Sequence, residues 1–304
     1  MSNRLALVID NCDYQDHLLS RLPRPQIESQ ALTSVLLDPS MGNFDNVELL
    51  TNPTAAQFRT HLSLLFNHKK QFDVLLLYYL GHALIDADDQ WYLATADTVG
   101  NCLAETAVSA AFISSLMDRG LSHQQIVVLD CCPGKRCLPD DGSVYLADKA
   151  GTDVAFKGNG YGRVILTAHN TIDYLLETDK VFGEPEPSVF TQYLIEGLRT
   201  GAADVDGDGQ IDVAELYEYV YYKVIRQTNQ KPRFWTYHSP DKFILGRNPK
   251  EVELPQPVKW DLIFGAVMAP IVTVIIGGLA SLSTSVGLAG LFLLMYALLY
   301  WTLD

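Results

Sequence analysis

The stretch Phe72-Asp73-Val74-Leu75-Leu76-Leu77-Tyr78-Tyr79-Leu80-Gly81 is apolar at nearly every position, and His82 follows it directly. A continuous apolar run of this kind is typical of a strand that is covered on both faces, as in a parallel sheet. Three similar runs lie at residues 5–10, 125–130 and 162–168. The sequence therefore predicts a mainly parallel sheet, with one strand that ends just before His82.

Segments with a helical spacing of apolar residues separate these predicted strands. They cover residues 25–37, 55–67 and 105–119. Strands that alternate with helices form an α/β domain, here a three-layer α/β/α sandwich with a mainly parallel sheet. A further short edge strand is predicted at residues 242–245. With 48% apolar residues, the chain can fill one large core or two smaller ones.

The chain is acidic, with 36 Asp and Glu residues against 22 Lys and Arg residues and a net charge of −14. Residues 260–304 contain no base and only two acids, so the first 259 residues hold 34 acids against 22 bases, a net charge of −12. An acidic surface repels phosphate backbones, and the sequence shows no basic run. We therefore expect no nucleic-acid partner.

The cysteines indicate a reducing compartment. There are five, without regular spacing: Cys12, Cys102, Cys131, Cys132 and Cys137. This odd number, together with the lack of a signal peptide before the first strand, favours the cytosol over a secreted disulfide framework. Since no two cysteines have the CxxC spacing, a zinc site is not expected.

A histidine and a cysteine that follow two of the predicted strands form the candidate catalytic pair. His82 follows the run at 72–81, and Cys132 follows the run at 125–131. The carboxyl ends of parallel strands share one edge of the sheet, where reactive crevices form. An imidazole can take the proton of a thiol and later deliver it to a leaving amine, which is the chemistry of a cysteine peptidase. Taken singly, either residue is more often part of a core, whereas together they favour a dyad.

The segment Asp204–Glu215 has the residue pattern of an EF-hand calcium loop, with Gly209 at the sharp turn. The expected ligands are oxygen donors: Asp204, Asp206, Asp208, Gln210 through its backbone carbonyl, Asp212 and Glu215. Segments with helical spacing flank the loop at residues 188–200 and 213–226. The sequence therefore predicts Ca²⁺ as a cofactor and leaves open whether it is structural or regulatory.

Residues 260–304 have the composition of a membrane anchor. They follow a soluble domain at 1–246 and a linker at 247–259, and they contain two uncharged apolar spans at 262–280 and 286–301. A bilayer core takes about 20 apolar residues per helix, so we predict a transmembrane hairpin. The alternative is a buried helical hairpin inside a larger core.

Charges and aromatic residues around the spans give the expected orientation. Trp260 and Trp301 lie at the ends of the hairpin, where interfacial aromatic residues are common. Arg247, Lys250 and Lys259 precede the first span, and no base follows it. We therefore expect the large domain to face the cytoplasm.

Two motifs and one helical segment carry a family resemblance: Tyr78-Tyr79-Leu80-Gly81-His82-Ala83, Leu129-Asp130-Cys131-Cys132 and residues 190–201. They resemble the caspase-like peptidases of clan CD, and most closely the bacterial metacaspase-like proteins, whose motifs read roughly Ser-Gly-His-Gly and Asp-x-Cys-x-Ser-Gly. The similarity covers about residues 4–246. By motif position Cys132, not Cys131, is the nucleophile. Many bacterial members carry the same Asp-rich loop.

This resemblance implies further site residues. The backbone N–H groups of Ala83 and Cys132 would form the oxyanion hole. An acidic primary pocket would take Arg or Lys, with Asp130 as one wall and either Asp10 or Asp13 as the other. The acidic charge of the chain agrees with cleavage after basic residues.

The leading hypothesis is a membrane-anchored, calcium-binding, caspase-like cysteine endopeptidase that cleaves proteins after Arg or Lys, in bacterial stress, cell death or defence by family analogy. Two alternatives stay open. Ala83 and the sequence Pro133-Gly134-Lys135 depart from the family motifs, which favours a catalytically inactive caspase-fold adaptor. Gly277-Gly278 and Gly287-x-x-Gly290 offer small faces for helix packing, which favours a homo-oligomer whose hairpin perturbs the membrane.

Overall fold

The computed structural model describes residues 2–17, 19, 21–22, 27–133, 152–168, 188–228, 230–238 and 242–250, without the side chains of residues 132, 133, 152 and 153. All of these residues belong to one compact unit, Met1–Val252. The predicted membrane spans and most of the predicted linker lie outside the described residues.

Six strands form the main path of a sheet: β2 (Asn46–Thr51), β1 (Arg4–Asp10), β3 (Val74–Ile85), β6 (Gln124–Pro133), β7 (Arg163–Thr167) and β9 (Arg233–Tyr237). The first five strands in this order are parallel, and β9 runs antiparallel to β7. Two short strands extend the sheet: β4 (Trp91–Leu93) pairs antiparallel with the end of β3, and β5 (Val108–Ser109) pairs with β4. The prediction of a mainly parallel sheet is confirmed.

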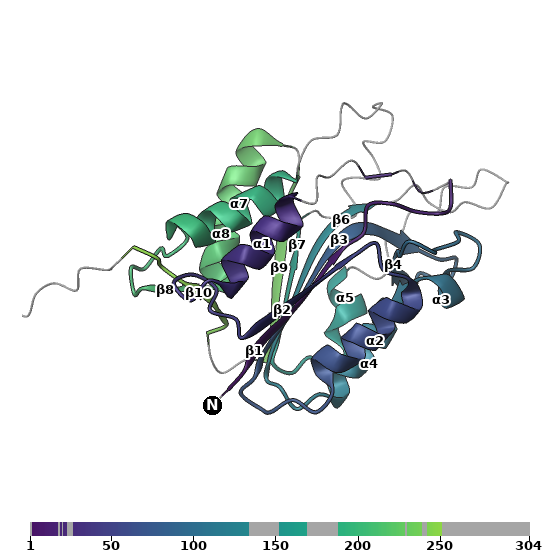
Figure 1. Ribbon diagram of the computed structural model, residues 1–304, viewed down its shortest axis with the longest axis horizontal. Helices are drawn as coiled ribbons and strands as arrows, with labels where there is room; N and C mark the ends of the chain where they lie inside the picture. The colour runs from purple at the N-terminus through teal and green to yellow at the C-terminus, as the bar shows by residue number, and fades with distance from the viewer. Residues whose placement is uncertain are drawn as a thin grey trace, which may run out of the picture. The chain divides into compact units, whose positions relative to one another are not determined.

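Helices cover both faces of this sheet (Figure 1). One face carries α1 (Ile27–Leu37), α7 (Val189–Thr200) and α8 (Val213–Gln227). The other face carries α2 (Ala55–Phe66), α4 (Ala110–Arg119) and α5 (Thr152–Lys157), and the short helix α3 (Leu103–Thr106) precedes β5. The predicted three-layer α/β/α arrangement is therefore also confirmed.

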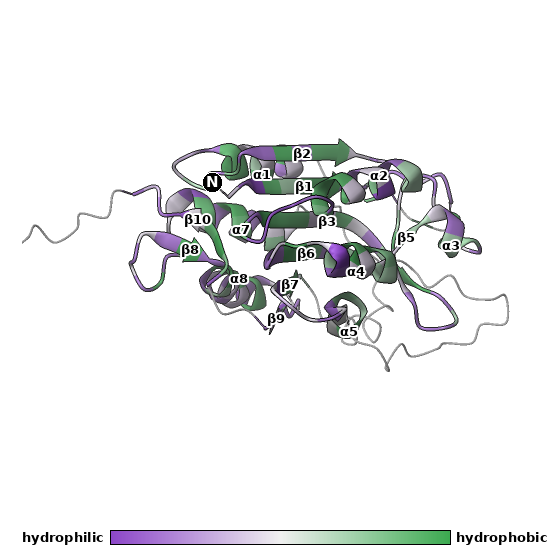
Figure 2. Ribbon diagram, turned by 90° about the horizontal axis from the view of Figure 1, so that it is seen from below, coloured by the Kyte–Doolittle hydropathy of each residue, from purple (hydrophilic) through white to green (hydrophobic). Residues whose placement is uncertain are grey.

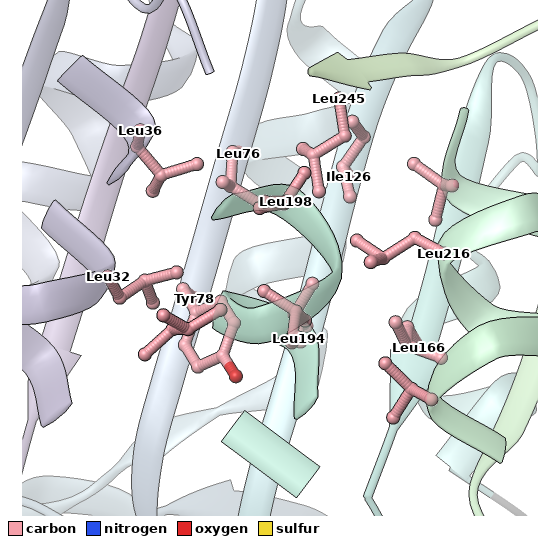
Figure 3. Packing of buried hydrophobic residues seen from close by; sticks show 14 of the residues in the cluster. Leu32, Leu36, Leu76, Tyr78, Ile126, Leu166, Leu194, Leu198, Leu216 and Leu245 are labelled. Carbon is pink, nitrogen blue, oxygen red and sulfur yellow. The ribbon is translucent and has the colours of Figure 1, made fainter. Parts of the chain in front are cut away.

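Side chains of the central strand β3 point alternately into two cores, because successive strand residues face opposite sides of a sheet. Leu76 and Tyr78 pack with residues of α1, α7 and α8 (Figure 3), while Leu77 and Tyr79 pack on the α2 and α4 side. None of these four side chains is more than 1% exposed. Figure 2 shows β1 and β3 largely in green, as expected of strands that are covered on both faces.

The predicted helix at residues 105–119 is wrong over its first part. The chain forms α3 and β5 there, and α4 begins only at Ala110. Val108 pairs with Leu93 of β4, and the Ser109 side chain accepts a hydrogen bond from the Phe112 N–H, which caps α4. Tertiary pairing and a helix cap thus override the helical spacing of this segment.

Two predicted strands also differ from the structure. β3 does not end before His82 but continues to Ile85, because β4 pairs with residues 83–85. The strand predicted at 242–245 is β10 (Ile244–Arg247), and it is not an edge of the main sheet. It pairs antiparallel with β8 (Gln210–Asp212), which lies within the acidic loop Asp204–Glu215, and so forms a separate two-stranded sheet.

Candidate active site

The structure places His82 directly opposite Cys132. β3 and β6 are neighbouring parallel strands, and their register pairs Gly81 with Cys131, His82 with Cys132, and Ala83 with Pro133. Neighbouring strands lie about 4.8 Å apart, so the backbones of the two residues are adjacent. The fold therefore brings together two residues that are 50 positions apart in the chain.

His82 is buried, with 3% of its surface exposed, and its backbone is held on both sides. Its N–H donates a hydrogen bond of 3.0 Å to the Tyr14 hydroxyl. Its carbonyl accepts hydrogen bonds from the Tyr79 hydroxyl and from the Ala94 N–H, both 2.9 Å long. The Tyr14 ring also packs against the imidazole, with 5.0 Å between ring centroids.

Tyr79 explains why a glycine precedes the histidine. Positions 79 and 81 face the same side of β3, so a side chain at position 81 would lie beside Tyr79. The Tyr79 side chain leans along the strand to reach the His82 carbonyl. A Cβ atom on Gly81 would lie 2.6 Å from Tyr79 Cζ, which is closer than real Cβ contacts. Only glycine therefore fits at position 81 while Tyr79 holds His82.

Two carboxylates lie on neighbouring strands beside the dyad. Asp10 of β1 and Asp130 of β6 both align with Leu80 of β3, two residues before His82, and each is 2% exposed. The Ser29 hydroxyl of α1 donates a hydrogen bond of 2.6 Å to Asp10. The Thr191 hydroxyl of α7 donates one of the same length to Asp130.

A third buried acid lies on the same face of the sheet and was missed by the sequence analysis. Glu28, in the first turn of α1, is 7% exposed, and its carboxylate accepts a hydrogen bond of 3.3 Å from the Ser188 N–H at the start of α7. An acid in the first turn of a helix is usually a solvated residue, so the sequence carries no signal for its burial.

Asp13 has a different environment from Asp10. It lies in the loop after β1, its side chain is 49% exposed, and it forms an ion pair of 2.6 Å with Arg21. Of the two alternatives for the second pocket wall, Asp10 lies on the sheet beside the dyad, whereas Asp13 lies at the surface with a basic partner. Nearby Cys12 is buried, and burial together with Asp10 and Asp13 raises the pKa of its thiol, which disfavours Cys12 as a nucleophile.

The acidic loop gathers carboxylates at one point. One carboxylate oxygen from each of Asp204, Asp206 and Asp208 lies within 4.8 Å of the others. Glu215 closes the loop, because its Oε1 accepts hydrogen bonds of 3.2 Å from the N–H groups of residues 205 and 206. Gly209 has a φ of 83°, a conformation that few other residues adopt. This set of hard oxygen donors fits a cation such as Ca²⁺.

Two residues close to β10 contact this loop. The Lys242 ammonium lies 2.9 Å from Asp206 and 3.4 Å from Asp208, and this contact lowers the pKa of the Asp206 carboxyl. The Asn248 side chain donates a hydrogen bond of 2.9 Å to Asp204. The loop thus carries a cationic partner supplied by the chain itself.

The structure does not reach the predicted membrane hairpin. In the part of the chain that it describes, no helix has the length and apolar character needed to cross a membrane. The spans predicted at 262–280 and 286–301 lie beyond the last described residue.

Comparison with known proteins places this geometry in a family. The caspase domain family matches residues 3–244. One similar solved structure is protein GSU0716 from Geobacter sulfurreducens, with 14% identity and a TM-score of 0.54, covering 81% of this chain and 98% of that chain. Another is caspase-1 from Spodoptera frugiperda, with 14% identity and a TM-score of 0.48, covering 78% and 88%. No curated protein matches the chain. Since the family match spans the whole sheet, including His82 and Cys132, the chain belongs to the caspase domain family and has a cysteine-peptidase fold.

Proposed function

We propose that this protein is a cysteine endopeptidase in which Cys132 is the nucleophile and His82 the general base. The observation that carries the proposal is the register of β3 and β6, which sets His82 opposite Cys132. The imidazole takes the thiol proton, the thiolate attacks the scissile carbonyl, and the imidazolium gives the proton to the leaving amine. Water then hydrolyses the thioester, with the same imidazole as base.

The hydrogen-bond pattern of β3 directs the Ala83 N–H toward β6, the strand that carries Cys132. Since the Ala94 N–H donates to the His82 carbonyl, residues 82 and 94 form a hydrogen-bonded pair of the antiparallel ladder. The next pair, Ala83 with Leu93, is then a non-bonded pair, so the Ala83 N–H faces away from β4 and toward β6. Together with the Cys132 N–H, it would stabilise the charge that develops on the carbonyl oxygen.

The buried carboxylates support cleavage after Arg or Lys. Asp130 and Asp10 align with Leu80, two residues before His82, on the face of the sheet that α1 and α7 cover, and Glu28 is buried between these two helices. A guanidinium or ammonium group of the substrate would pair with such carboxylates by charge-assisted hydrogen bonds. Asp13, which Arg21 already neutralises, is the weaker choice for this pocket.

The test of this function is cleavage of peptides that end in Arg, Lys or Asp by the full-length protein in detergent. We expect cleavage after Arg or Lys that Cys132→Ala abolishes. Cys131→Ala is the matched control, because it removes the neighbouring thiol on the same strand, and it should retain cleavage. Activity that survives Cys132→Ala but not Cys131→Ala would move the nucleophile by one residue and refute the assignment.

We propose that the loop Asp204–Glu215 binds Ca²⁺ through Asp204, Asp206, Asp208, the Gln210 carbonyl, Asp212 and Glu215. The convergence of carboxylate oxygens supports this. A bound Ca²⁺ would neutralise the carboxylates and hold the end of α7 to the start of α8. Calorimetric titration with Ca²⁺ should show binding that Asp204→Asn weakens, whereas Asp88→Asn, which changes an exposed acid elsewhere, should leave it unchanged. Equal binding by both variants would contradict the assignment.

The apolar composition of residues 260–304 supports a membrane anchor with the peptidase domain facing the cytoplasm. The same tail is the proposed site of homo-oligomer contacts. A setting in bacterial stress, cell death or defence follows by family analogy alone. Fractionation of cells that express the full chain or residues 1–252 tests the anchor, and recovery of both proteins in the soluble fraction would refute it.

A second function is favoured by one specific observation. The two departures from the family motifs, Ala83 and Pro133, are opposite each other in the β3–β6 register, directly beside the dyad. A proline lacks the N–H that another residue would offer there. An inactive caspase-fold adaptor would keep the fold and bind partners, and it predicts no cleavage of any peptide by the wild-type protein.

A further inference from the structure

We propose that Tyr14 is a positioning residue that fixes the orientation of the His82 imidazole. The inference rests on the proposed function, since it concerns the base of the same dyad. Neither the family motifs nor the spacing of His82 and Cys132 points to Tyr14, which lies in the loop after β1. Three independent contacts carry the inference.

The first contact replaces part of the sheet ladder. In a hydrogen-bonded antiparallel pair, each residue donates to and accepts from the residue opposite. At the pair of His82 and Ala94, the Ala94 N–H donates to the His82 carbonyl. The His82 N–H donates instead to the Tyr14 hydroxyl at 3.0 Å, and the Ala94 carbonyl accepts from the Tyr79 hydroxyl at 2.8 Å. Tyr14 therefore takes the place of a strand partner at the catalytic histidine.

The second contact sets the direction of the Tyr14 hydroxyl. Its proton goes to the Asn11 carbonyl, at 2.6 Å, which leaves an oxygen lone pair to accept from the His82 N–H. The Asn11 N–H in turn donates to the Leu80 carbonyl, two residues before His82. Tyr14 is thus linked to β3 directly at His82 and, through Asn11, at Leu80.

The third contact is between the rings. The Tyr14 ring lies 5.0 Å from the imidazole, at an angle of 41°, and so limits rotation of the His82 side chain. Tyr14 itself is held by its neighbours, because the Gln15 N–H donates to the Ala96 carbonyl and Asp16 accepts from the Gly100 N–H. The loop after β1 and the segment after β4 therefore fix one side of the imidazole.

Orientation of this kind affects turnover more than substrate binding. A displacement of about 1 Å in a catalytic group can cost about 100-fold in rate, because proton transfer requires a narrow geometry. Tyr14→Phe keeps the ring and removes the acceptor for the His82 N–H, whereas Tyr14→Leu removes both. We expect a loss in kcat of about tenfold for the first and about 100-fold for the second, with little change in KM.

The experiment compares wild-type protein, Tyr14→Phe, Tyr14→Leu and a matched control, Tyr161→Phe. Tyr161 is 46% exposed and lies before β7, at the opposite edge of the sheet, so its variant should behave as wild type. Three quantities are measured: kcat and KM on the best Arg or Lys peptide, and the rate at which iodoacetamide alkylates Cys132, followed by mass spectrometry. His82→Ala gives the alkylation rate without the base.

Wild-type kcat and alkylation rates in Tyr14→Phe would overturn the inference. A loss of kcat in proportion to a loss of folded protein, measured by circular dichroism, would also overturn it, because Tyr14 would then have only a structural role. If the wild-type protein cleaves no peptide, the proposed activity fails, and the alkylation rates still test whether Tyr14 positions His82. An alkylation rate that falls in Tyr14→Phe toward that of His82→Ala supports the inference. Equal alkylation rates in wild-type protein, Tyr14→Phe, Tyr14→Leu and Tyr161→Phe overturn it.

Discussion

The pocket assignment makes a quantitative prediction for Asp130. Asp130→Asn keeps the size of the side chain and retains an oxygen that can accept the hydrogen bond from Thr191, so the fold should be preserved. The change removes a negative charge from a site that is only 2% exposed. Loss of one partner of a buried ion pair with a ligand costs about 2–5 kcal/mol. At about 1.4 kcal/mol per factor of ten, kcat/KM for an Arg peptide should fall by about 30-fold to several thousand-fold.

The same assay on Asp13→Asn provides the contrast. Asp13 is half exposed and paired with Arg21, and an exposed ion pair contributes about 0.2–1 kcal/mol. The variant should therefore change kcat/KM by about fivefold at most. A peptide with citrulline in place of Arg should be cleaved almost equally by wild-type protein and Asp130→Asn, because it lacks the charge. If Asp130→Asn keeps the wild-type preference for Arg over citrulline, Asp130 is not part of the pocket.

Three further predictions concern the scaffold and the acidic loop. Arg163 is fully buried, pairs with Asp118 and donates hydrogen bonds to backbone carbonyls of α5. Arg163→Met should therefore lower the free energy of unfolding, measured in urea, by about 3–5 kcal/mol. A loss below about 1 kcal/mol would show that Arg163 does not stabilise the fold in this way. Gly81→Ala should cost about 1–3 kcal/mol in the same measurement, because the new methyl group overlaps Tyr79, and unchanged stability would show that Tyr79 can move. Lys242→Met should strengthen Ca²⁺ binding about two- to fivefold in calorimetric titration, since the ammonium competes for the same carboxylates, whereas weaker binding would show that the lysine supports the site.

The strands that are covered on both faces could be predicted from the sequence, whereas the exposed edge strand and the shortest strands could not. β3 and β6 are covered on both faces, so their apolar runs have no polar interruptions. β2 is an edge strand whose residues are partly or fully exposed, and it includes Asn46 and Glu48. β4 and β5 have three and two residues, which is too few to show a period. They exist because the end of β3 offers unpaired backbone groups, a property of the fold rather than of the segments.

The proposed catalytic pair and the residues around it can be divided in the same way into those that the sequence predicts and those that it does not. The nearness of His82 and Cys132 could be predicted from the strand pattern, because their strands are parallel, although both residues lie within the paired strands and not after them. Tyr14 and Glu28 do not, since each reaches the site through contacts between residues far apart in the chain, Tyr14 with His82 and Glu28 with Ser188. A tyrosine in a loop and an acid in a first helical turn have many other uses, so only the folded arrangement distinguishes them.

The pairing of β10 with β8 gives the end of the domain a mechanical role. β10 is the last strand in the described part of the chain, and it is bonded to β8, which lies within the acidic loop Asp204–Glu215. Tension on the chain beyond residue 250 would load the hydrogen bonds between β10 and β8, together with those from the Arg4 side chain of β1 to the carbonyls of Ile244 and Leu245. The hydrogen bond between the Asn248 side chain and Asp204 would bear part of the same load. A tethered form of this protein would therefore transmit force to the acidic loop and to the start of β1, which lies at the opposite end of the parallel strands from His82 and Cys132.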